Sequence, residues 1–589
     1  MVPFCPGGGR PEARETRQTR HPGRRVNPVD SSAAALLLLS RVSFRQARTM
    51  GDVRHHDDRP GDRSPRMGLL AGLVALFPAV VAVWAFPGFV TQDGPAHLYN
   101  AHILAKSIGP ASPFRGVFAV RWEPLPNWAG HLALMGLVGA LPPRAADRLM
   151  TTAMLVGFAG SVGWLRWRVA GGRGLATAAV LAVALGLNVT WLLGFSSFML
   201  GAALMPVTLG VWWAGRTGGF SGRRAGALAG LTVLGYFCHV VSLGLTAFGL
   251  VVLDALTPGR DRRGRASGTA LGLLPILPLG WLYLGLTRRG GGGMAPEWGY
   301  LSEPFSARAW VAQLTWVDPV SLARKDLIPL ADGDGAGWGV VFAPVLWLAA
   351  GVALAAVGAW RRGEGVAGER RGWWVLAGLL LVGGVLSPDT MGASHGHYLP
   401  QRIVLLGLAV LVPVLRFETT GTSVVLAVAL GLQSATVWDY ARASERSAGR
   451  LLKAGGAVGT GQRVAALLIG IPTPFRANPL LHADCALGVG TGNVIWGDYE
   501  TRFYYFPVRV AEGLDHPDPA ELEWIALHGS PADSAGRAAR WGALLERHHR
   551  AIDVVVVWGR DAGLDALTAR WFVPVYEDGP VRVFRRRPG

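Results

Sequence analysis

Apolar residues recur along the chain in blocks that are separated by short polar stretches. Most of these blocks are about 15 to 22 residues long, the length that crosses a bilayer rather than the length of an ordinary core helix. The blocks run over residues 68–90, 126–142, 147–165, 175–195, 197–214, 224–238, 240–257, 269–287, 339–360, 372–387, 402–416 and 422–438. The pattern predicts an α-helical polytopic membrane protein.

Arginines in the loops between the blocks predict the orientation in the membrane. Four Arg-rich loops, which alternate with loops nearly free of arginine, cover residues 166–173, 216–224, 260–265 and 361–371. Positive loops stay in the cytoplasm, and all four can lie there only if one early block does not cross. Block 126–142 is bounded by prolines and interrupted by His131. We therefore predict about 11 crossings, with block 126–142 along or dipping into the outer face, as a juxtamembrane helix of the first outer loop.

Three regions follow from this orientation. Residues 1–66 form an Arg-rich tail that we expect to be disordered and cytoplasmic, and Met50 or Met67 is an alternative start. Residues 67–438 form the transmembrane domain. Residues 439–589 have the composition of a soluble domain and lie on the periplasmic side, together with the long outer segments 91–146 and 288–338.

The C-terminal region alternates strand patterns with a helix pattern. Residues 463–470 and 553–559 are apolar runs typical of buried strands, and residues 532–549 are typical of a helix. Two further strand patterns flank the turn at Gly579 and Pro580. The order predicts a small periplasmic α/β domain.

Composition excludes several classes of protein. Half of the residues are apolar and only 16% are charged, too few charges to cover the surface of a soluble enzyme. Nearly all of the cations behind the net charge of +18 are arginines, and many of them lie in short loops where they set topology, so the charge does not indicate nucleic acid as a partner. No Walker or Rossmann motif stands in a suitable context, which argues against an ATP-driven pump.

The strongest local signal is the segment TQDGPAHLYN, residues 91–100, directly after the first apolar block. Asp93 lies at the outer mouth of the first span, and a helix from Gly94 would carry His97 about one turn later. At the bilayer surface, partial burial would raise the pKa of Asp93 and suit it to act as a general base. The alternative is that Asp93 only caps its helix, with Pro95 in the first turn.

Other candidate ligand-binding residues lie in the outer segments. Arg402 opens a span at the outer face and could bind phosphate through two hydrogen bonds, or could be an interfacial arginine. His395 and His397 in the preceding loop could contact phosphate or sugar, or form a metal pair. His239 lies between two spans, on the same side as Asp93, and either faces a cavity or is a satisfied helix-end histidine.

Several segments together resemble the integral-membrane glycosyltransferases of the GT-C superfold, in an uncharacterised bacterial branch. The resemblance rests on an acidic residue in the long outer loop after the first span, on juxtamembrane helices, and on a periplasmic C-terminal domain. The segments are TQDGPAHLYNAHIL (91–104), GFSSFMLG (194–201), GYFCHVVSLGL (235–245), HYLPQR (397–402) and GDYETRFYYFPVR (497–509).

The resemblance implies a multi-pass protein of the bacterial inner membrane whose donor is a polyprenyl-phosphate-linked sugar. Asp93 would be the catalytic base, and the acceptor would be a glycan, lipid or protein at the periplasmic face. A divalent cation is compatible with the family, but no adjacent acidic pair occurs in the outer loop 91–146, and Glu123 is the nearest second carboxylate. The rival hypothesis is a non-catalytic transporter or a lipid-handling or assembly protein.

Overall fold

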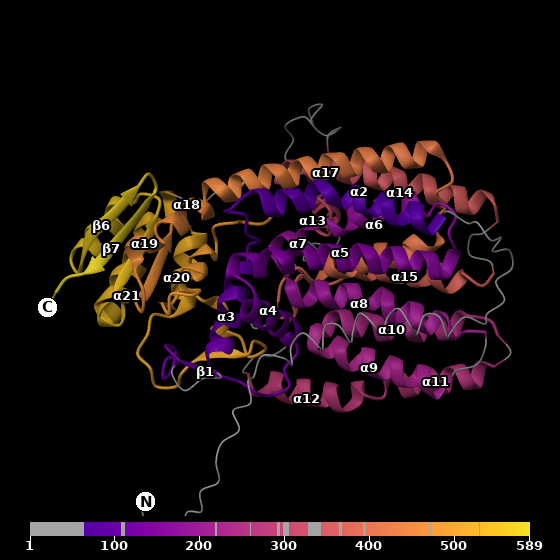
Figure 1. Cartoon of the computed structure of the whole chain (residues 1–589), viewed down its shortest axis with the longest axis horizontal. Helices are drawn as coiled ribbons and strands as arrows, with labels where there is room; N and C mark the ends of the chain where they lie inside the picture. The colour runs from indigo at the N-terminus through magenta and orange to yellow at the C-terminus, as the bar shows by residue number, and fades with distance from the viewer. Residues whose placement is uncertain are drawn as a thin grey trace, which may run out of the picture. The chain divides into compact units, whose positions relative to one another are not determined.

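The computed structural model describes most of the chain (Figure 1). The described residues are 64–107, 112–217, 221–259, 261–290, 295–298, 306–327, 343–363, 368–392, 396–471, 473–528 and 531–588. The predicted N-terminal tail lies outside these residues up to position 63, and so does His395.

Each of the twelve apolar blocks contains an α-helix. The helices of these blocks, which we call the helical layer, are α2 (Ser64–Ala85), α4 (Trp128–Ala140), α5 (Pro143–Ala170), α6 (Leu175–Gly186), α7 (Val189–Leu193), α8 (Ser196–Trp213), α9 (Gly222–Cys238), α10 (Val240–Leu256), α11 (Arg262–Leu273), α12 (Ile276–Arg289), α14 (Pro344–Arg361), α15 (Arg371–Val385), α16 (Leu399–Leu411) and α17 (Thr420–Arg446). Two more helices, α3 (Gly94–Ser107) and α13 (Ala307–Trp316), and the strand β1 (Phe118–Val120) belong to the outer loops.

Length and composition indicate a multi-pass membrane protein. Five helices in the described residues are long and apolar enough to cross a membrane: 65–85, 196–213, 262–289, 344–361 and 420–458. Five shorter apolar helices accompany them. One of these is α4, which has 13 residues and therefore extends only about 20 Å, less than the thickness of a bilayer core. Helices α6 and α16, with 12 and 13 residues, are equally short, so length does not test the prediction that block 126–142 does not cross.

Block 175–195 differs from the continuous helix that its apolar run predicts. Helix α6 ends at Gly186, and Asn188 then caps the short helix α7 by accepting a hydrogen bond from the Trp191 N–H at 3.0 Å. The break frees backbone carbonyls inside the helical layer. Gln433 of α17 donates its side-chain amide to the carbonyls of Ala184 (3.1 Å) and Leu187 (3.0 Å). This buried polar side chain thus satisfies two backbone carbonyls at the helix break, which would otherwise lack partners in an apolar setting.

Replacing Gln433 with leucine should therefore destabilise the protein. The free energy of unfolding should fall by about 1–3 kcal/mol, because carbonyls that the amide satisfies become buried without partners. Thermal unfolding of the detergent-solubilised chain measures the effect. Gln462→Leu is the control, since the amide of this half-buried residue serves only a nearby carbonyl, that of Thr460. Equal melting temperatures for the two variants would contradict the prediction.

The C-terminal region forms the mixed α/β domain that its strand patterns predicted. Its five-stranded sheet has the order β3-β2-β5-β7-β6, in which β2 runs parallel to β3 and β5, and β7 runs antiparallel to β5 and β6. The strands of the sheet are β2 (Arg463–Leu468), β3 (Val494–Ile495), β5 (Val554–Trp558), β6 (Phe572–Asp578) and β7 (Val581–Arg586), and the domain also contains β4 (Val508–Val510) outside this sheet. Its helices are α18 (Ala448–Lys453), α19 (Gly455–Val458), α20 (Pro519–Leu527), α21 (Ser534–His548) and α22 (Ala562–Ala569).

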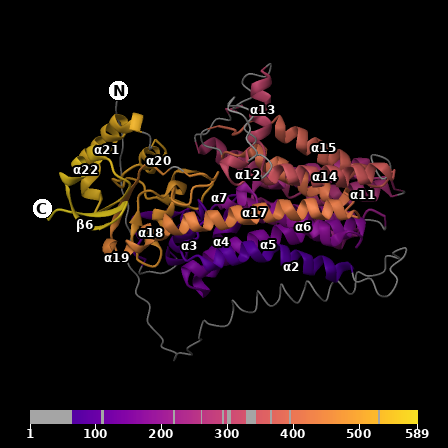
Figure 2. The ribbon, with the colours of Figure 1, turned by 90° about the horizontal axis from the view of Figure 1, so that it is seen from above.

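The first outer loop packs against this domain. Strand β1 of the loop pairs antiparallel with β4 of the domain, and α3 lies between the membrane helices and the domain (Figures 1 and 2). Residues 94–104 of α3 are all buried, which a helix at a water-exposed membrane surface would not be. The Tyr99 hydroxyl, for example, donates to the Asn493 carbonyl at 2.8 Å. Helix α3 is therefore packed against protein on its whole circumference.

A second outer loop is attached by Arg476, which follows β2. The buried guanidinium of Arg476 donates to the carbonyls of Trp316, Asp318 and Ser321. Next to it, the Arg324 N–H donates to the Pro474 carbonyl at 2.7 Å. Membrane helices, outer loops and C-terminal domain thus meet at one end of the helical layer.

Candidate functional site

A cavity of about 430 Å³ lies where these parts meet. The cavity is lined by five of the residues that were predicted for the site from the sequence: Asp93, His97, His239, His397 and Arg402. They come from segments that are up to about 300 residues apart, so the fold, and not local sequence, brings them together.

Two predicted site residues are not among those that line the cavity. Glu123 is exposed and lies outside the lining. His395 lies outside the described residues.

The turn that carries Asp93 is held by backbone hydrogen bonds to α7. The N–H groups of Gln92 and Asp93 donate to the carbonyls of Leu192 and Leu193 at 3.2 and 2.9 Å. Gly194 follows with a φ of +83°, and a Cβ at this position would collide with the Thr91 hydroxyl. Only glycine suits both the conformation and the close approach, which explains the first residue of the GFSSFMLG segment.

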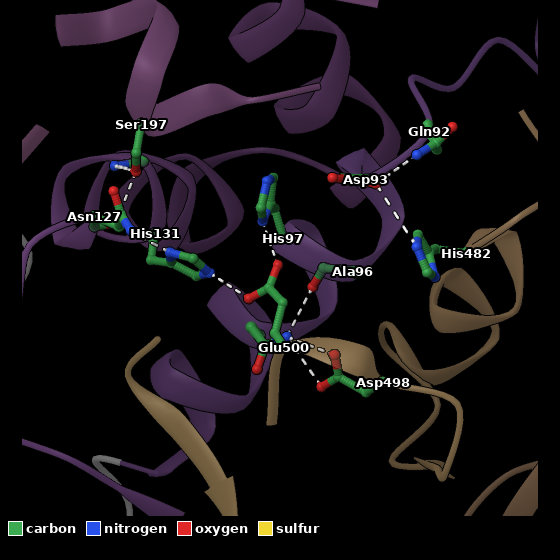
Figure 3. Close-up of polar contacts among 12 residues, drawn as sticks. Gln92, Asp93, Ala96, His97, Asn127, His131, Ser197, His482, Asp498 and Glu500 are labelled. Carbon is green, nitrogen blue, oxygen red and sulfur yellow. Dashed lines mark hydrogen bonds and ion pairs between the residues drawn. The ribbon is translucent and has the colours of Figure 1, made fainter. Parts of the chain in front are cut away.

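The backbone of Asp93 immediately precedes helix α3, and its side chain faces the cavity. Its carbonyl accepts the His97 N–H at 3.0 Å, as expected of the residue that precedes a helix. Its carboxylate accepts a hydrogen bond from the Gln92 amide at 3.3 Å and lies 3.7 Å from His482 Nε2 (Figure 3). The cap hypothesis therefore describes the backbone of Asp93, and the carboxylate remains available for chemistry.

Burial makes the carboxyl group of Asp93 a weaker acid. Desolvation raises its pKa to about 6, against the opposing effects of the His97 charge and of hydrogen bonds from Tyr499 and Gln92. The neighbouring His482 stacks on Tyr499 with ring centroids 4.3 Å apart. Burial lowers the pKa of His482 to about 3, so this imidazole is neutral near pH 7 and does not compete for the carboxylate as a cation.

Glu500 of the C-terminal domain is the second carboxylate of the site. It reaches between two histidines of the first outer loop (Figure 3). One oxygen contacts His97 Nδ1, and the other lies 2.7 Å from His131 Nε2. Burial favours the neutral forms, but the opposite charges prevail, so the pKa of Glu500 is lowered and that of His97 is raised. The three side chains thus form a buried network, and His97 connects it to the cavity.

The donor set of this cluster fits a divalent cation. One ligand atom from each of His97, His131 and Glu500 lies within 4.8 Å of the others, and all three residues are buried. Two imidazoles with one carboxylate are ligands that zinc and other first-row divalent ions accept. The three side chains could therefore hold such an ion at the edge of the cavity.

Arg402 and His239 form a hydrogen-bonded pair in the wall of the cavity. The guanidinium lies over the rings of Phe195 and Phe198, 4.6 and 5.3 Å from their centroids. Arg402 Nη1 lies 3.0 Å from His239 Nε2, and because a guanidinium can only donate, the imidazole nitrogen accepts from it. His239 thus orients a guanidinium whose other N–H groups suit an anionic oxygen.

His397 lies at the water-exposed side of the cavity. Its Nδ1 is 3.4 Å from Asp389 Oδ2, and the hydrogen bond to this carboxylate raises the pKa of His397. The next residue, Tyr398, adopts a left-handed backbone conformation with a φ of +66°, which is unusual for a bulky residue. Its ring stacks on Trp316 at 5.6 Å, so packing holds this turn in place.

The sequence did not predict Glu500, His482 and Tyr499 as residues of the site. All come from the C-terminal domain, and no spacing rule connects them to Asp93. The segment GDYETRFYYFPVR, which contains Glu500 and Tyr499, already stood out among the motifs of the family resemblance. Two acidic residues, Asp498 and Glu500, at the start of such an aromatic run were the available signal.

Comparison with known proteins yields similarity at the level of the fold. No protein-family model matches the sequence, and no curated protein matches it. Two solved structures are similar over most of the chain. One is the arabinofuranosyltransferase AftD from mycobacteria, with 17% identity, 91% of this chain covered and a TM-score of 0.46. The other is the oligosaccharyltransferase AglB from Archaeoglobus fulgidus, in complex with an inhibitory peptide and a dolichol-phosphate, with 10% identity, 89% coverage and a TM-score of 0.43.

The chain spans 41% of the length of the AftD chain and 74% of that of AglB.

Proposed function

We propose that the protein is a membrane glycosyltransferase that moves a sugar from a polyprenyl-phosphate donor to a hydroxyl group of an acceptor. The observation that supports this most directly is that Asp93, His239 and Arg402 line one cavity. A buried carboxylate with a pKa near 6 faces the same cavity as the Arg402 guanidinium, which donates to His239 and can donate its other N–H groups to an anion. This pairing of a base with an anion site is what glycosyl transfer from a lipid phosphate requires.

In the proposed reaction, Asp93 takes the proton of the acceptor hydroxyl while its oxygen attacks the anomeric carbon of the donor sugar. The bond from that carbon to the phosphate oxygen breaks, and its electron pair leaves with the polyprenyl phosphate. Attack from the face opposite to the phosphate inverts the anomeric centre. Arg402 and His239 stabilise the negative charge that develops on the phosphate.

The cluster of His97, His131 and Glu500 would hold a divalent cation in this scheme. A bound cation supplies additional positive charge for the leaving phosphate. Glu500 and His131 also fix the orientation of His97, whose ring lines the cavity. These side chains keep the wall next to Asp93 rigid.

The proposed setting is the outer face of a bacterial inner membrane. About 11 crossings, a cytoplasmic N-terminus and a periplasmic C-terminal domain place the cavity at the periplasmic side. A polyprenyl-linked sugar would then reach Asp93 from the outer leaflet.

The direct test is transfer of sugar by the full chain reconstituted in lipid nanodiscs. Polyprenyl-phosphate donors that carry different radiolabelled sugars are incubated with the protein in the presence of envelope extract as the source of acceptor. Release of polyprenyl phosphate together with label in a new product supports the proposal. No consumption of any donor under these conditions would refute it.

Replacing Arg402 with glutamine should weaken use of the donor. We expect kcat/KM for the donor to fall by about 10²-fold, because a charge-assisted contact to phosphate is lost. Initial rates at varied donor concentration measure the effect. Arg442→Gln is the control, since the Arg442 side chain is exposed on α17 and pairs with Asp439 at 3.0 Å. Equal loss in both variants would remove Arg402 from the anion site.

The rate should depend on pH through Asp93. A base must be deprotonated to act, so kcat/KM should decline about tenfold per pH unit below a pKa of about 6. His482 stays neutral over this range because its pKa is about 3. Initial rates from about pH 5 to pH 8, each with a check that the protein stays folded, give the profile. A flat profile across this interval would contradict the assignment of the base.

A further inference from the structure

Three lining residues of the cavity, Arg502, Glu523 and His397, are partly exposed, and we call them the mouth. Arg502 Nη1 donates to Glu523 Oε2 at 2.9 Å, and these side chains are exposed by 34% and 25%. His397 pairs with Asp389, which does not itself line the cavity. The positive charges of Arg502 and His397 both oppose the effect of burial, which raises the pKa of Glu523. The mouth is therefore rich in donors and acceptors but nearly neutral in net charge.

Behind the mouth, one wall consists of aromatic rings from the C-terminal domain. Phe503, Tyr505 and Phe506 line the cavity. The rings of Phe503 and Tyr505 stack with centroids 5.3 Å apart and planes inclined by 22°. Tyr505 and Phe506 are 4.8 Å apart. Arg502 lies over the Phe503 ring at 5.5 Å, so the wall continues directly into the charged pair at the mouth.

We infer that this wall and mouth bind the acceptor and that the acceptor is a neutral saccharide. The inference rests on the proposed function and specifies the substrate class of the same site. Sugar rings have apolar faces that pack on aromatic rings, while their edges carry hydroxyls that both donate and accept hydrogen bonds. Neighbouring hydroxyls match a guanidinium next to a carboxylate, because one hydroxyl accepts from Arg502 while the next donates to Glu523.

The charge distribution favours this class over an anionic acceptor. The cationic side chains of the mouth, Arg502 and His397, each face a carboxylate, so a phosphate or carboxylate ligand would meet repulsion there as well as attraction. The anion site instead lies at Arg402 and His239, among membrane residues. One cavity thus offers an anionic subsite for the donor and a neutral, aromatic subsite for the acceptor.

The test is equilibrium binding to the full chain in nanodiscs, without donor. The probes are a panel of fluorescently labelled neutral trisaccharides of hexoses and pentoses, a labelled peptide of similar size, and myo-inositol phosphate as an anionic probe. We expect at least one trisaccharide to bind saturably to the wild-type chain and to Asp93→Asn. Binding should weaken by about tenfold in Tyr505→Ala and in Glu523→Gln.

Tyr576→Ala is the matched control, because Tyr576 is a half-buried tyrosine on β6 that does not line the cavity. Its binding should equal that of the wild type. Failure of every trisaccharide to bind, or saturable binding of the peptide or the anionic probe that Tyr505→Ala abolishes, would overturn the inference. The proposed catalysis is read out separately, by consumption of the donor, and would survive that result.

Discussion

Replacing Asp93 with asparagine should abolish turnover and leave the protein folded. The amide has the size of the carboxyl group and can still contact Gln92, but it cannot accept the proton of an acceptor hydroxyl. A general base contributes about 10²–10⁴-fold to a rate. We therefore expect kcat to fall by at least about 100-fold, with little change in KM for the donor, because uniform binding is retained.

Initial rates of donor consumption, together with a thermal unfolding curve for the same preparation, measure this effect. The control is Asp439→Asn, whose carboxylate is exposed on α17 and should be dispensable. Unchanged turnover in Asp93→Asn with intact folding would leave Asp93 as a helix start only. It would favour the rival class of a transporter or an assembly protein.

Replacing Glu500 with alanine should be the most destabilising single change in the site. The substitution leaves His97 and His131 buried without the carboxylate that both contact. Breaking a buried network of charges by removing one partner costs about 3–5 kcal/mol. We expect a matching fall in the free energy of unfolding and a loss of activity, because the residues of α3 and α4 that frame the cavity lose their connection to the C-terminal domain.

The milder variant Glu500→Gln separates stability from chemistry. It keeps the shape of the side chain, so it should be less destabilising, but it should bind a divalent ion much more weakly. Titration of wild type and variant with zinc or manganese, followed by calorimetry, tests the metal hypothesis without any substrate. The control for stability is Glu512→Ala, an exposed partner of Arg509, whose loss should change little. Equal stability of Glu500→Ala and this control would contradict the role of the network.

Local signals in the sequence allowed a large part of this structure to be predicted. The apolar blocks predicted the helices because their lengths and composition leave few alternatives, and the apolar runs at 463–470 and 553–559 predicted β2 and β5. Asp93 could be singled out because its whole context, an apolar block followed by a helix start, fits within ten residues. Such features depend on neighbours in sequence.

The features that could not be predicted from the sequence depend on residues that are far apart along the chain. His97 and Glu500 are 403 positions apart, and nothing in either segment specifies the other. The break between α6 and α7 was equally hidden, because part of its backbone is satisfied by Gln433, on a helix more than 200 residues later. Glu123 was the nearest carboxylate in sequence and is exposed, whereas the carboxylate that reaches the site belongs to another domain.

This separation along the chain has a consequence for how the protein is made. A ribosome synthesises Asp93, His97 and His131 early, and the membrane helices can insert before Glu500 and His482 exist. The candidate site is completed only when the last part of the chain has packed against α3. A newly inserted or prematurely terminated chain therefore contains Asp93 and Arg402 but lacks the wall and mouth that flank them. Completion of synthesis is itself the step that assembles the candidate site.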